Sequence, residues 1–224
     1  KLSADCLAGT KLIDVSPHRE KILHLMNDYR NKVAGGYTKT MMPAARMARM
    51  DWSTELEFLA SIYVAQCSSM LRPCMSSPQF TTVGSIYDGV TFLGKFRSSM
   101  VPMLLEETIN GWFEPTRFVT NSMVSKINYN LQKRTMRQVV LLMTDRNNLM
   151  GCRGLYFEKY QAKNFRLVCT FATDLIVNVP IYNVSLPAGR HCARIDATYE
   201  NLCALGEKYN NRQPYSEVRM LDSP

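Results

Sequence analysis

Seven cysteines and three histidines are the residues of this chain with the most chemical potential. Thiolates and imidazoles bind zinc when they are clustered, but the sequence contains neither a Cys-x-x-Cys pair nor a Cys/His cluster. A reduced intracellular protein of 224 residues seldom carries seven cysteines without such a role. The cysteines therefore predict disulfide bonds in a secreted, extracellular protein.

The histidines, His18, His24 and His191, lie outside any catalytic motif that we recognise. The sequence has no G-x-S-x-G, H-E-x-x-H, P-loop or G-x-G-x-x-G pattern. Two of the three fall on the expected surface of a helix, and the third lies in a loop beside Cys192. We therefore predict that the protein is not an enzyme and that it binds no metal and no cofactor.

The net charge of +8 comes from 27 Lys and Arg residues against 19 Asp and Glu residues. Such a surface attracts acidic proteins or anionic glycans. The basic residues are spread along the chain, and no zinc finger, RNP or basic-zipper pattern occurs, so a nucleic-acid partner is not expected. No run of about 18 apolar residues is present, so we predict no membrane span. We expect a monomer.

Apolar residues at helical spacing, with capping residues and prolines at their ends, predict three helices in the first half of the chain. Ser16 is expected to cap the first helix and Ser53 the second. The three helices begin at Ser16-Pro17, Ser53 and Pro102, and they end at Gly35-Gly36, near Cys67 and before Pro115, respectively.

The second half of the chain predicts strands. The continuous apolar run from Val139 to Met143 is typical of a strand covered on both faces. Two further strands are expected at residues 154–160 and 165–171, joined by a turn of sequence QAKN. Helices followed by an antiparallel sheet predict an α+β layered domain.

From about residue 181 the chain turns irregular and contains two cysteines, Cys192 and Cys203. We interpret residues 181–224 as a disulfide-pinned extension of a domain formed by residues 1–180. The extension contains the sequon Asn183-Val184-Ser185, which a secretory route could use for glycosylation.

The segment MPAARMARMDWSTELEFLASIYVAQC, residues 42–67, carries a specific pattern: PAA, Met or Leu, Trp, Glu-Leu and a terminal Gln-Cys. It closely resembles the signature of the cysteine-rich secretory, antigen 5 and pathogenesis-related (CAP) superfamily, of the insect venom antigen 5 type found in biting-fly saliva. The resemblance runs from about Cys6 to Cys203. It implies a three-layer α-β-α sandwich with a central, mainly antiparallel sheet, stabilised by disulfides.

The resemblance also implies a cysteine pairing. Cys152 would pair with Cys169, and Cys192 with Cys203. The bridge from Cys6 to Cys67 would tie an amino-terminal leader to the second helix. The seventh cysteine, Cys74, has an equivalent in venom members that pairs with a cysteine far upstream, so either such a leader precedes Lys1 or Cys74 stays unpaired.

Relatives in this family place two histidines and two glutamates around a central cleft, where they hold divalent metal in some members. Each position can be located here by its motif. Met26 replaces the histidine of HNxxR, and Ser85 replaces the glutamate of GENL. Pro115 replaces the glutamate of WYxE, and Thr135 replaces the histidine of GHYTQVVW. All four ionisable groups are lost, and the nearby His24 and Glu114 point about 200° and 100° away from the vacated positions if both segments are helical.

A cleft without these groups is less polar, and relatives bind sterols, fatty acids or eicosanoids in grooves between helices. The sequence therefore leads us to expect binding of a small hydrophobic lipid in an interhelical channel, which would scavenge mediators at a host interface. The residues assigned to this channel are Met26, Leu105, Ile109, Trp112 and Phe113. A polar anchor for the lipid could come from Tyr29, Arg30, Arg46, Arg49 or Tyr63.

The alternative is a secreted antagonist of a receptor, an integrin or an ion channel that acts through exposed loops and a basic surface. The integrin motif RGD is absent, and Arg153-Gly154-Leu155 comes nearest to it.

Overall fold

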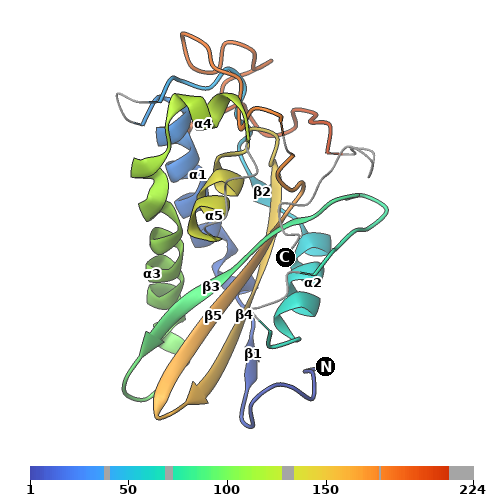
Figure 1. The fold of residues 1–224 in the computed structure, drawn as a ribbon, viewed down its shortest axis with the longest axis vertical. Helices are drawn as coiled ribbons and strands as arrows, with labels where there is room; N and C mark the ends of the chain where they lie inside the picture. Colours follow the sequence, from blue (N-terminus) through green and yellow to red (C-terminus); the bar gives the residue numbers. More distant parts are fainter. Residues whose placement is uncertain (38–40, 69–72, 128–133, 177, 212–224) are drawn as a thin grey trace.

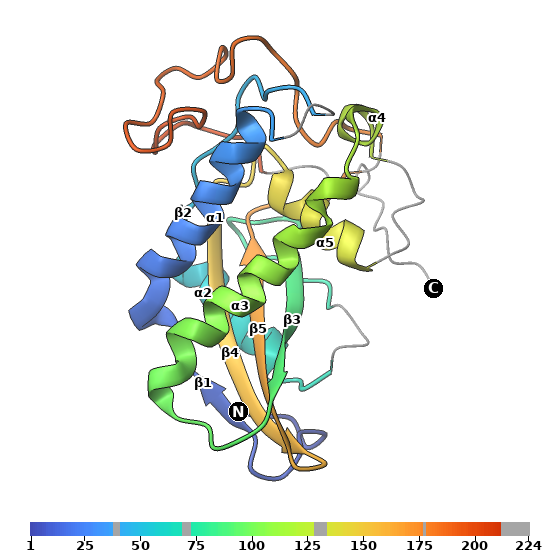
Figure 2. The ribbon, with the colours of Figure 1, turned by 90° about the vertical axis from the view of Figure 1, so that its left-hand side faces the viewer.

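The computed structural model describes residues 1–37, 41–68, 73–127, 134–176 and 178–211. It contains a central sheet with helices on both faces (Figures 1 and 2). Helix α2 (Thr54–Val64) covers one face. Helices α1 (Arg19–Ala34), α3 (Val101–Phe113) and α5 (Arg134–Met143) pack together on the other face. The three-layer α+β architecture predicted from the sequence is confirmed.

The sheet is mainly antiparallel, with the strand order β1-β4-β5-β3, and the short β2 adds to β4 in parallel. The long β4–β5 hairpin is the predicted one, but its strands begin earlier than predicted. The turn is only Tyr160-Gln161, because the last three residues of QAKN already belong to β5. The sequence did not reveal β3. The strands are β1 (Lys11–Ile13), β2 (Asp51–Trp52), β3 (Gly84–Phe92), β4 (Leu149–Lys159) and β5 (Ala162–Phe171).

The prediction of a strand from Val139 to Met143 is wrong, because these residues form the second half of α5. Each of their side chains is 0% exposed. Helix α5 lies between α1, α3 and the sheet, so even the side that an ordinary surface helix shows to water is covered. A continuous apolar run records burial on all sides, and it does not distinguish a buried strand from a buried helix.

The helix ends agree only in part with their predicted caps. Ser53 caps α2 as expected, since its Oγ accepts a hydrogen bond from the amide of Leu56 at 3.3 Å. Ser16 does not cap a helix. It lies inside a 3₁₀ turn (Ser16–His18) that precedes α1, and its own amide donates to Asp14 at 3.0 Å. Beyond α3 the chain continues in a 3₁₀ turn (Glu114–Phe118) and the short α4 (Asn121–Ser125).

Three disulfides join distant parts of the chain, and they are the pairs that the resemblance implied. Cys6–Cys67 ties the amino-terminal leader to the end of α2. Cys152–Cys169 joins two residues that face one another on β4 and β5. Cys192–Cys203 closes a loop in the carboxy-terminal segment. Cys74 takes no part in these three bonds and is exposed.

The main hydrophobic core lies between the sheet and the layer formed by α1, α3 and α5. Residues beyond position 180 also contribute to it, namely Ile181, Tyr182, Tyr199 and Leu202. The irregular carboxy-terminal segment up to Asn211 therefore packs on the same core as the helices, and the domain boundary near residue 180 stays a prediction. Within the described ranges, no helix combines the length and apolarity that crossing a membrane requires.

Candidate functional site

The four positions where relatives carry histidine or glutamate are distributed over four elements. Met26, on α1, is 1% exposed and belongs to the core. Ser85, on β3, is also buried, and its Oγ has no hydrogen-bond partner in the described structure. Pro115 lies in the 3₁₀ turn after α3, and Thr135 is exposed in the first turn of α5. None of these side chains titrates near neutral pH, so this set offers no general acid, base or imidazole ligand.

The two nearby ionisable groups are engaged elsewhere. His24 is exposed on α1, and its Nδ1 lies 3.1 Å from the hydroxyl of Tyr199. The carboxylate of Glu114 is exposed and pairs with Arg117 at 3.3 Å. Neither group replaces a member of the lost set.

The five residues assigned to the lipid channel gather where α1 packs against α3, a region that we call the helix seam. Met26 comes from α1, and the other four come from α3. Met26, Leu105, Ile109 and Trp112 are each at most 2% exposed. Phe113 is half-buried, so the seam reaches the surface at this residue. The structure thus brings the five together as packed side chains, and the channel itself stays a prediction.

Tyr29 closes the seam beside Phe113. The two rings are stacked, with centroids 3.9 Å apart and planes 1° from parallel. The Tyr29 hydroxyl lies 2.6 Å from Oγ1 of Thr116, which in turn donates to the carbonyl oxygen of Phe113 at 2.5 Å. Because the hydroxyl hydrogen of Thr116 is used on Phe113, the Tyr29 hydroxyl is the donor to Thr116. Burial raises the pKa of Tyr29 well above its usual value.

Arg30 is 1% exposed, and its guanidinium is surrounded by backbone carbonyl groups. Nε and Nη2 donate to Ala48 at 3.0 and 2.8 Å, and Nη1 donates to Leu142 and Thr144 at 2.7 and 2.9 Å. Burial lowers its pKa to about 10, which leaves the group charged at neutral pH. Its donors join α1 to the loop at Ala48 and to the carboxy-terminal end of α5, so Arg30 is not available as a lipid anchor.

The other proposed anchors lie apart from the helix seam. Arg46 pairs with Glu207 at 2.9 Å and lies over the ring of Tyr209. Arg49 pairs with Asp196 at 2.8 Å. Tyr63, on α2, packs near Tyr87 on the opposite face of the sheet.

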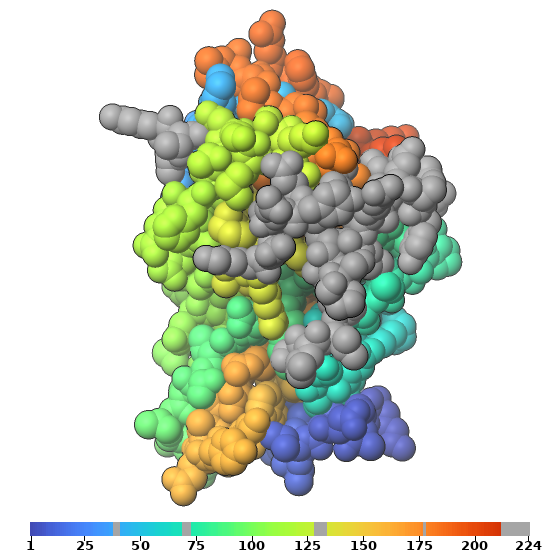
Figure 3. Space-filling model, viewed as in Figure 1, coloured from blue at the N-terminus to red at the C-terminus, as the bar shows by residue number. Residues whose placement is uncertain are grey.

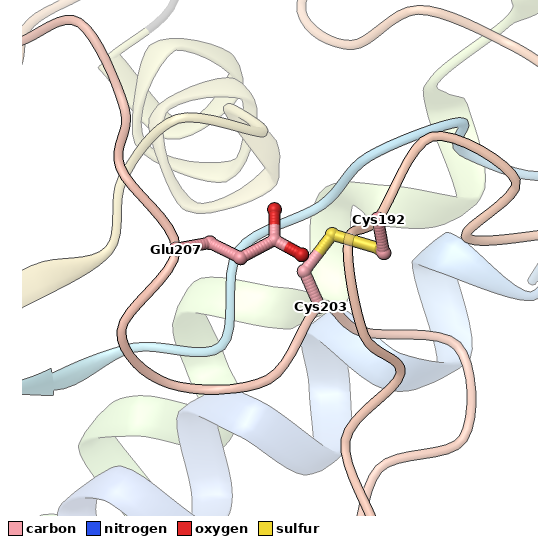
Figure 4. A group of neighbouring side chains, drawn as sticks. All are labelled: Cys192, Cys203 and Glu207. Atoms are coloured by element: carbon pink, nitrogen blue, oxygen red, sulfur yellow. A yellow bond between two sulfur atoms is a disulfide. The ribbon is translucent and has the colours of Figure 1, made fainter.

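Glu207 lies beside the Cys192–Cys203 disulfide, and the three side chains are close enough to resemble a metal site (Figure 4). The two sulfurs are bonded to one another, so they offer no thiolate. Glu207 instead accepts hydrogen bonds from the amides of Ala193 and Arg194, at 2.6 and 3.2 Å, and from Arg46. The group therefore holds the carboxy-terminal segment against the disulfide loop.

A cavity of about 520 Å³ lies between the carboxy-terminal segment and the start of β4. Three polar atoms at its lining are buried and have no partner among the described residues: Nε of Arg49, the hydroxyl of Tyr209 and Oδ1 of Asn211. The lining contains none of the five residues of the helix seam and none of the four vacated positions. It is a separate cavity with a mixed polar and apolar lining, and a small molecule or water would find hydrogen bonds at these three atoms.

The end of the sheet carries the two most exposed apolar side chains of the described structure. Tyr160, in the β4–β5 turn, is 91% exposed, and Leu93, just after β3, is 82% exposed. Figure 3 shows this turn as the lower extremity of the molecule. Sequence reasoning missed this surface, because it placed Tyr160 at the end of a strand and the turn at QAKN. We call it the sheet tip and define it by the exposed residues Leu93, Lys95, Arg97, Lys159 and Tyr160.

Backbone conformation at the turn of the sheet tip is unusual. Tyr160 and Gln161 have φ angles of 51° and 65°, in the left-handed region that glycine and asparagine favour. A bulky side chain there costs about 1 kcal/mol. The turn therefore keeps an exposed aromatic residue where Asn-Gly would be more stable.

The comparisons with known proteins agree with the fold. The model of the cysteine-rich secretory protein family matches residues 23–171, more than half of the chain. Tabinhibitin 1 of Tabanus yao is 26% identical over 193 residues, which cover 85% of this chain and 73% of that protein. The antigen 5 like allergen Cul n 1 of Culicoides nubeculosus is 28% identical over 148 residues, or 66% of each chain.

Solved structures share the fold at lower identity. The structure of a hookworm platelet inhibitor superposes with a TM-score of 0.58 at 19% identity, and it covers 85% of this chain and 91% of its own. Together with the family match, this likeness places the three-layer sandwich in a known group. The chain belongs to the cysteine-rich secretory protein (CAP) family.

Proposed function

We propose that this chain is a secreted, non-catalytic binding protein that antagonises a protein on host cells through the sheet tip. The observation that carries the proposal is the exposure of Tyr160 and Leu93 among basic side chains. Aromatic and arginine residues are the commonest anchors of protein interfaces. Secretion itself is supported by the family and by the three disulfides.

The charge of the sheet tip indicates which partner it fits. Lys95, Arg97 and Lys159 are exposed, and the ammonium of Lys159 lies 5.3 Å from the Tyr160 ring. The neighbouring carboxylate of Glu158 is already bonded to Lys163 and to the hydroxyl of Tyr156. An acidic partner surface would pair with these exposed cations around the two apolar anchors.

The strained turn supports the same proposal. Residues in sparsely populated backbone regions tend to be kept where they serve binding or catalysis. At Tyr160 and Gln161 the cost of the left-handed backbone is not offset by buried contacts of the Tyr160 ring, because that ring is exposed. Binding of a partner to the ring would explain why the turn retains it.

A binding assay on washed platelets tests the proposal, since a protein of the same fold is a hookworm platelet inhibitor. Labelled wild-type protein should bind the cells and reduce aggregation, and Tyr160→Ala should lower both by at least tenfold. Raised sodium chloride should weaken binding, because exposed cations are screened by salt. Treatment of the platelets with heparinase before the assay should leave binding intact. A loss of binding after this treatment would show that the sheet tip binds an anionic glycan.

Phe58→Ala provides the matched control. Phe58 lies on α2 and is 63% exposed. Its replacement by alanine therefore removes an exposed aromatic ring far from the turn. It should bind and inhibit like the wild type. Equal activity of Tyr160→Ala and the wild type would show that the sheet tip is not the binding surface.

Lipid binding at the helix seam is a second proposal, favoured by one observation. The apolar cluster of Met26, Leu105, Ile109 and Trp112 reaches the surface at Phe113. An acyl chain that enters there would need the α1–α3 contact to open. Met26 would adapt readily to such a ligand because its side chain is flexible.

Displacement of the fluorescent fatty acid cis-parinaric acid tests this second proposal. Phe113→Arg should abolish uptake, because it would place a charged side chain at the entrance of the channel. The guanidinium group could still reach water, so the variant should fold. Phe118→Arg is the control, since Phe118 follows five residues later and is 61% exposed. Unchanged uptake by a folded Phe113→Arg variant would reject this placement, and mass spectrometry of an organic extract would identify any lipid that co-purifies.

A further inference from the structure

We propose that Asn183 is an N-glycosylation site and that its glycan covers the end of the molecule opposite the sheet tip. The sequence Asn183-Val184-Ser185 satisfies the acceptor pattern, and the residue between Asn183 and Ser185 is not proline. The inference rests on the secretory route included in the proposed function, but not on the identity of any partner.

The structure holds the backbone of the acceptor tripeptide and leaves its side chain exposed. The carbonyl oxygen of Asn183 accepts from the amide of Ala45 at 2.6 Å, and the amide of Ser185 donates to Pro43 at 2.9 Å. Val184 forms an isolated bridge with Ala44 between these two bonds. Asn183 itself is exposed, and no described hydrogen bond of its side chain would have to break. The finished fold can therefore accommodate a glycan at Nδ2 without rearrangement.

The chemistry requires a donor of one class, an oligosaccharide linked to a lipid diphosphate. The Asn183 Nδ2 forms a bond to the anomeric carbon of the first sugar. The bond between that carbon and the diphosphate oxygen breaks, and the diphosphate leaves with the electron pair. One amide proton passes to a base of the transferase, so no oxidant or reductant is needed. The transfer must precede folding of this loop, since residues 183–185 are later bonded to residues 43–45.

The surroundings of Asn183 give the glycan a role. Val184 and Leu186 are 46% and 65% exposed, and Met42 on the facing segment is 40% exposed. A sugar chain on Asn183 would shield these apolar side chains from other proteins. The loops of this carboxy-terminal region lie at one end of the molecule, and the β4–β5 turn lies at the other (Figure 1). The sheet tip would remain uncovered.

Expression of the full chain behind a secretion signal in mammalian cells tests the site. Secreted wild-type protein should lose mass on treatment with PNGase F, and peptide mapping should place the resulting aspartate at position 183. Asn183→Gln and Ser185→Ala should show no mass loss, whereas Ser185→Thr, which keeps an acceptor hydroxyl, should retain it. If a variant is not secreted, the pool inside the secretory pathway is assayed in the same way.

Unmodified wild-type protein in the medium would overturn the proposal. Glycan occupancy is measured without any partner, so this result would leave the sheet tip proposal untouched. Conversely, glycosylated protein that fails to bind platelets would reject the sheet tip and retain the glycan. Protein stripped by PNGase F should bind platelets as well as the glycosylated form does, and a loss of binding on stripping would contradict the placement of the glycan away from the binding surface.

Discussion

The rings of Tyr29 and Phe113 lie face to face, with centroids 3.9 Å apart, and they join α1 to the last residue of α3. The hydroxyl of Tyr29 adds a hydrogen bond to Thr116 beyond the end of α3. Contact between the two helices at this point therefore combines an aromatic pair with a polar bond.

Substitution at these residues should separate the two contributions. Tyr29→Phe keeps the ring and removes the hydroxyl, and we expect a loss of about 1 kcal/mol in the free energy of unfolding. Phe113→Ala removes the stacked ring, and we expect a loss of about 2 to 3 kcal/mol, since the ring is only half-buried. Urea denaturation measures both. A larger effect of Tyr29→Phe would show that the hydroxyl contributes more than the ring.

Two glycines should respond to alanine in opposite directions. A Cβ at Gly151 on β4 would come within 2.7 Å of the carbonyl carbon of Leu56, because the backbone of α2 lies directly on the sheet there. We expect Gly151→Ala to destabilise the protein by more than about 2 kcal/mol. Gly111, in α3, is exposed and has no atom within 4 Å of an added Cβ. Gly111→Ala should stabilise the protein by about 1 kcal/mol.

Thermal denaturation of Gly151→Ala and Gly111→Ala measures both effects, and each variant is the control for the other. If both variants lower the melting temperature, the helical conformation of residue 111 would be contradicted. If both are neutral, the close approach of α2 to β4 would be contradicted.

Asp196 should make stability depend on acid pH. Burial alone would raise its pKa, but hydrogen bonds from Arg49 and from the amides of Thr198 and Tyr199 outweigh it and lower the pKa below its usual value. The folded state therefore favours the carboxylate, so its contribution is present above the unfolded pKa of about 3.9 and is lost as the pH falls through the lower folded value. Asp196→Asn should be less stable than the wild type at pH 7, and the difference should shrink below about pH 4.

Chemical denaturation at a series of pH values checks this behaviour. A difference between Asp196→Asn and the wild type that is equal at pH 7 and pH 2.5 would mean that the carboxylate charge is not the cause.

Replacement of the turn Tyr160-Gln161 by Asn-Gly should increase stability while it removes binding. Both new residues accept the left-handed backbone, so we expect a gain of about 1 to 2 kcal/mol in the free energy of unfolding. The same variant lacks the exposed ring and should fail to bind platelets. A variant that is more stable and still binds would show that the turn, and not the Tyr160 side chain, carries the interaction.

Caps, prolines and apolar spacing in the sequence predicted helices α1, α2 and α3 and the β4–β5 hairpin, and the family resemblance implied the three-layer arrangement. Ser53 and Pro102 begin their helices close to the predicted residues, and the pairing that the family resemblance implied agrees with the three disulfides. Val139 to Met143 was assigned to the wrong element, because burial on every side removes the polar residues that reveal helical period. Strand β3 was not predicted, because it begins with Gly84 and contains Gly89, and glycine weakens a strand pattern.

The candidate sites were predictable only in so far as they depend on residue type. The loss of the four ionisable groups can be read from the motifs, since no geometry is needed to see that Met26 and Pro115 do not titrate. The sheet tip could not be predicted, because exposure of Tyr160 depends on how far the β4–β5 hairpin extends beyond the helices. The hydrogen bonds of Arg30 could not be predicted either, because their acceptors come from residue 48 and from residues 142–145.

The carbonyl groups around Arg30 have a consequence for synthesis on the ribosome. Three of its acceptors, at Leu142, Thr144 and Asp145, lie 112 to 115 positions later in the chain. Helix α1 leaves the exit tunnel long before they are translated, and at about 5 to 20 residues per second the delay amounts to several seconds. Throughout that interval a cationic side chain destined for the interior has to remain in water or be held by a chaperone.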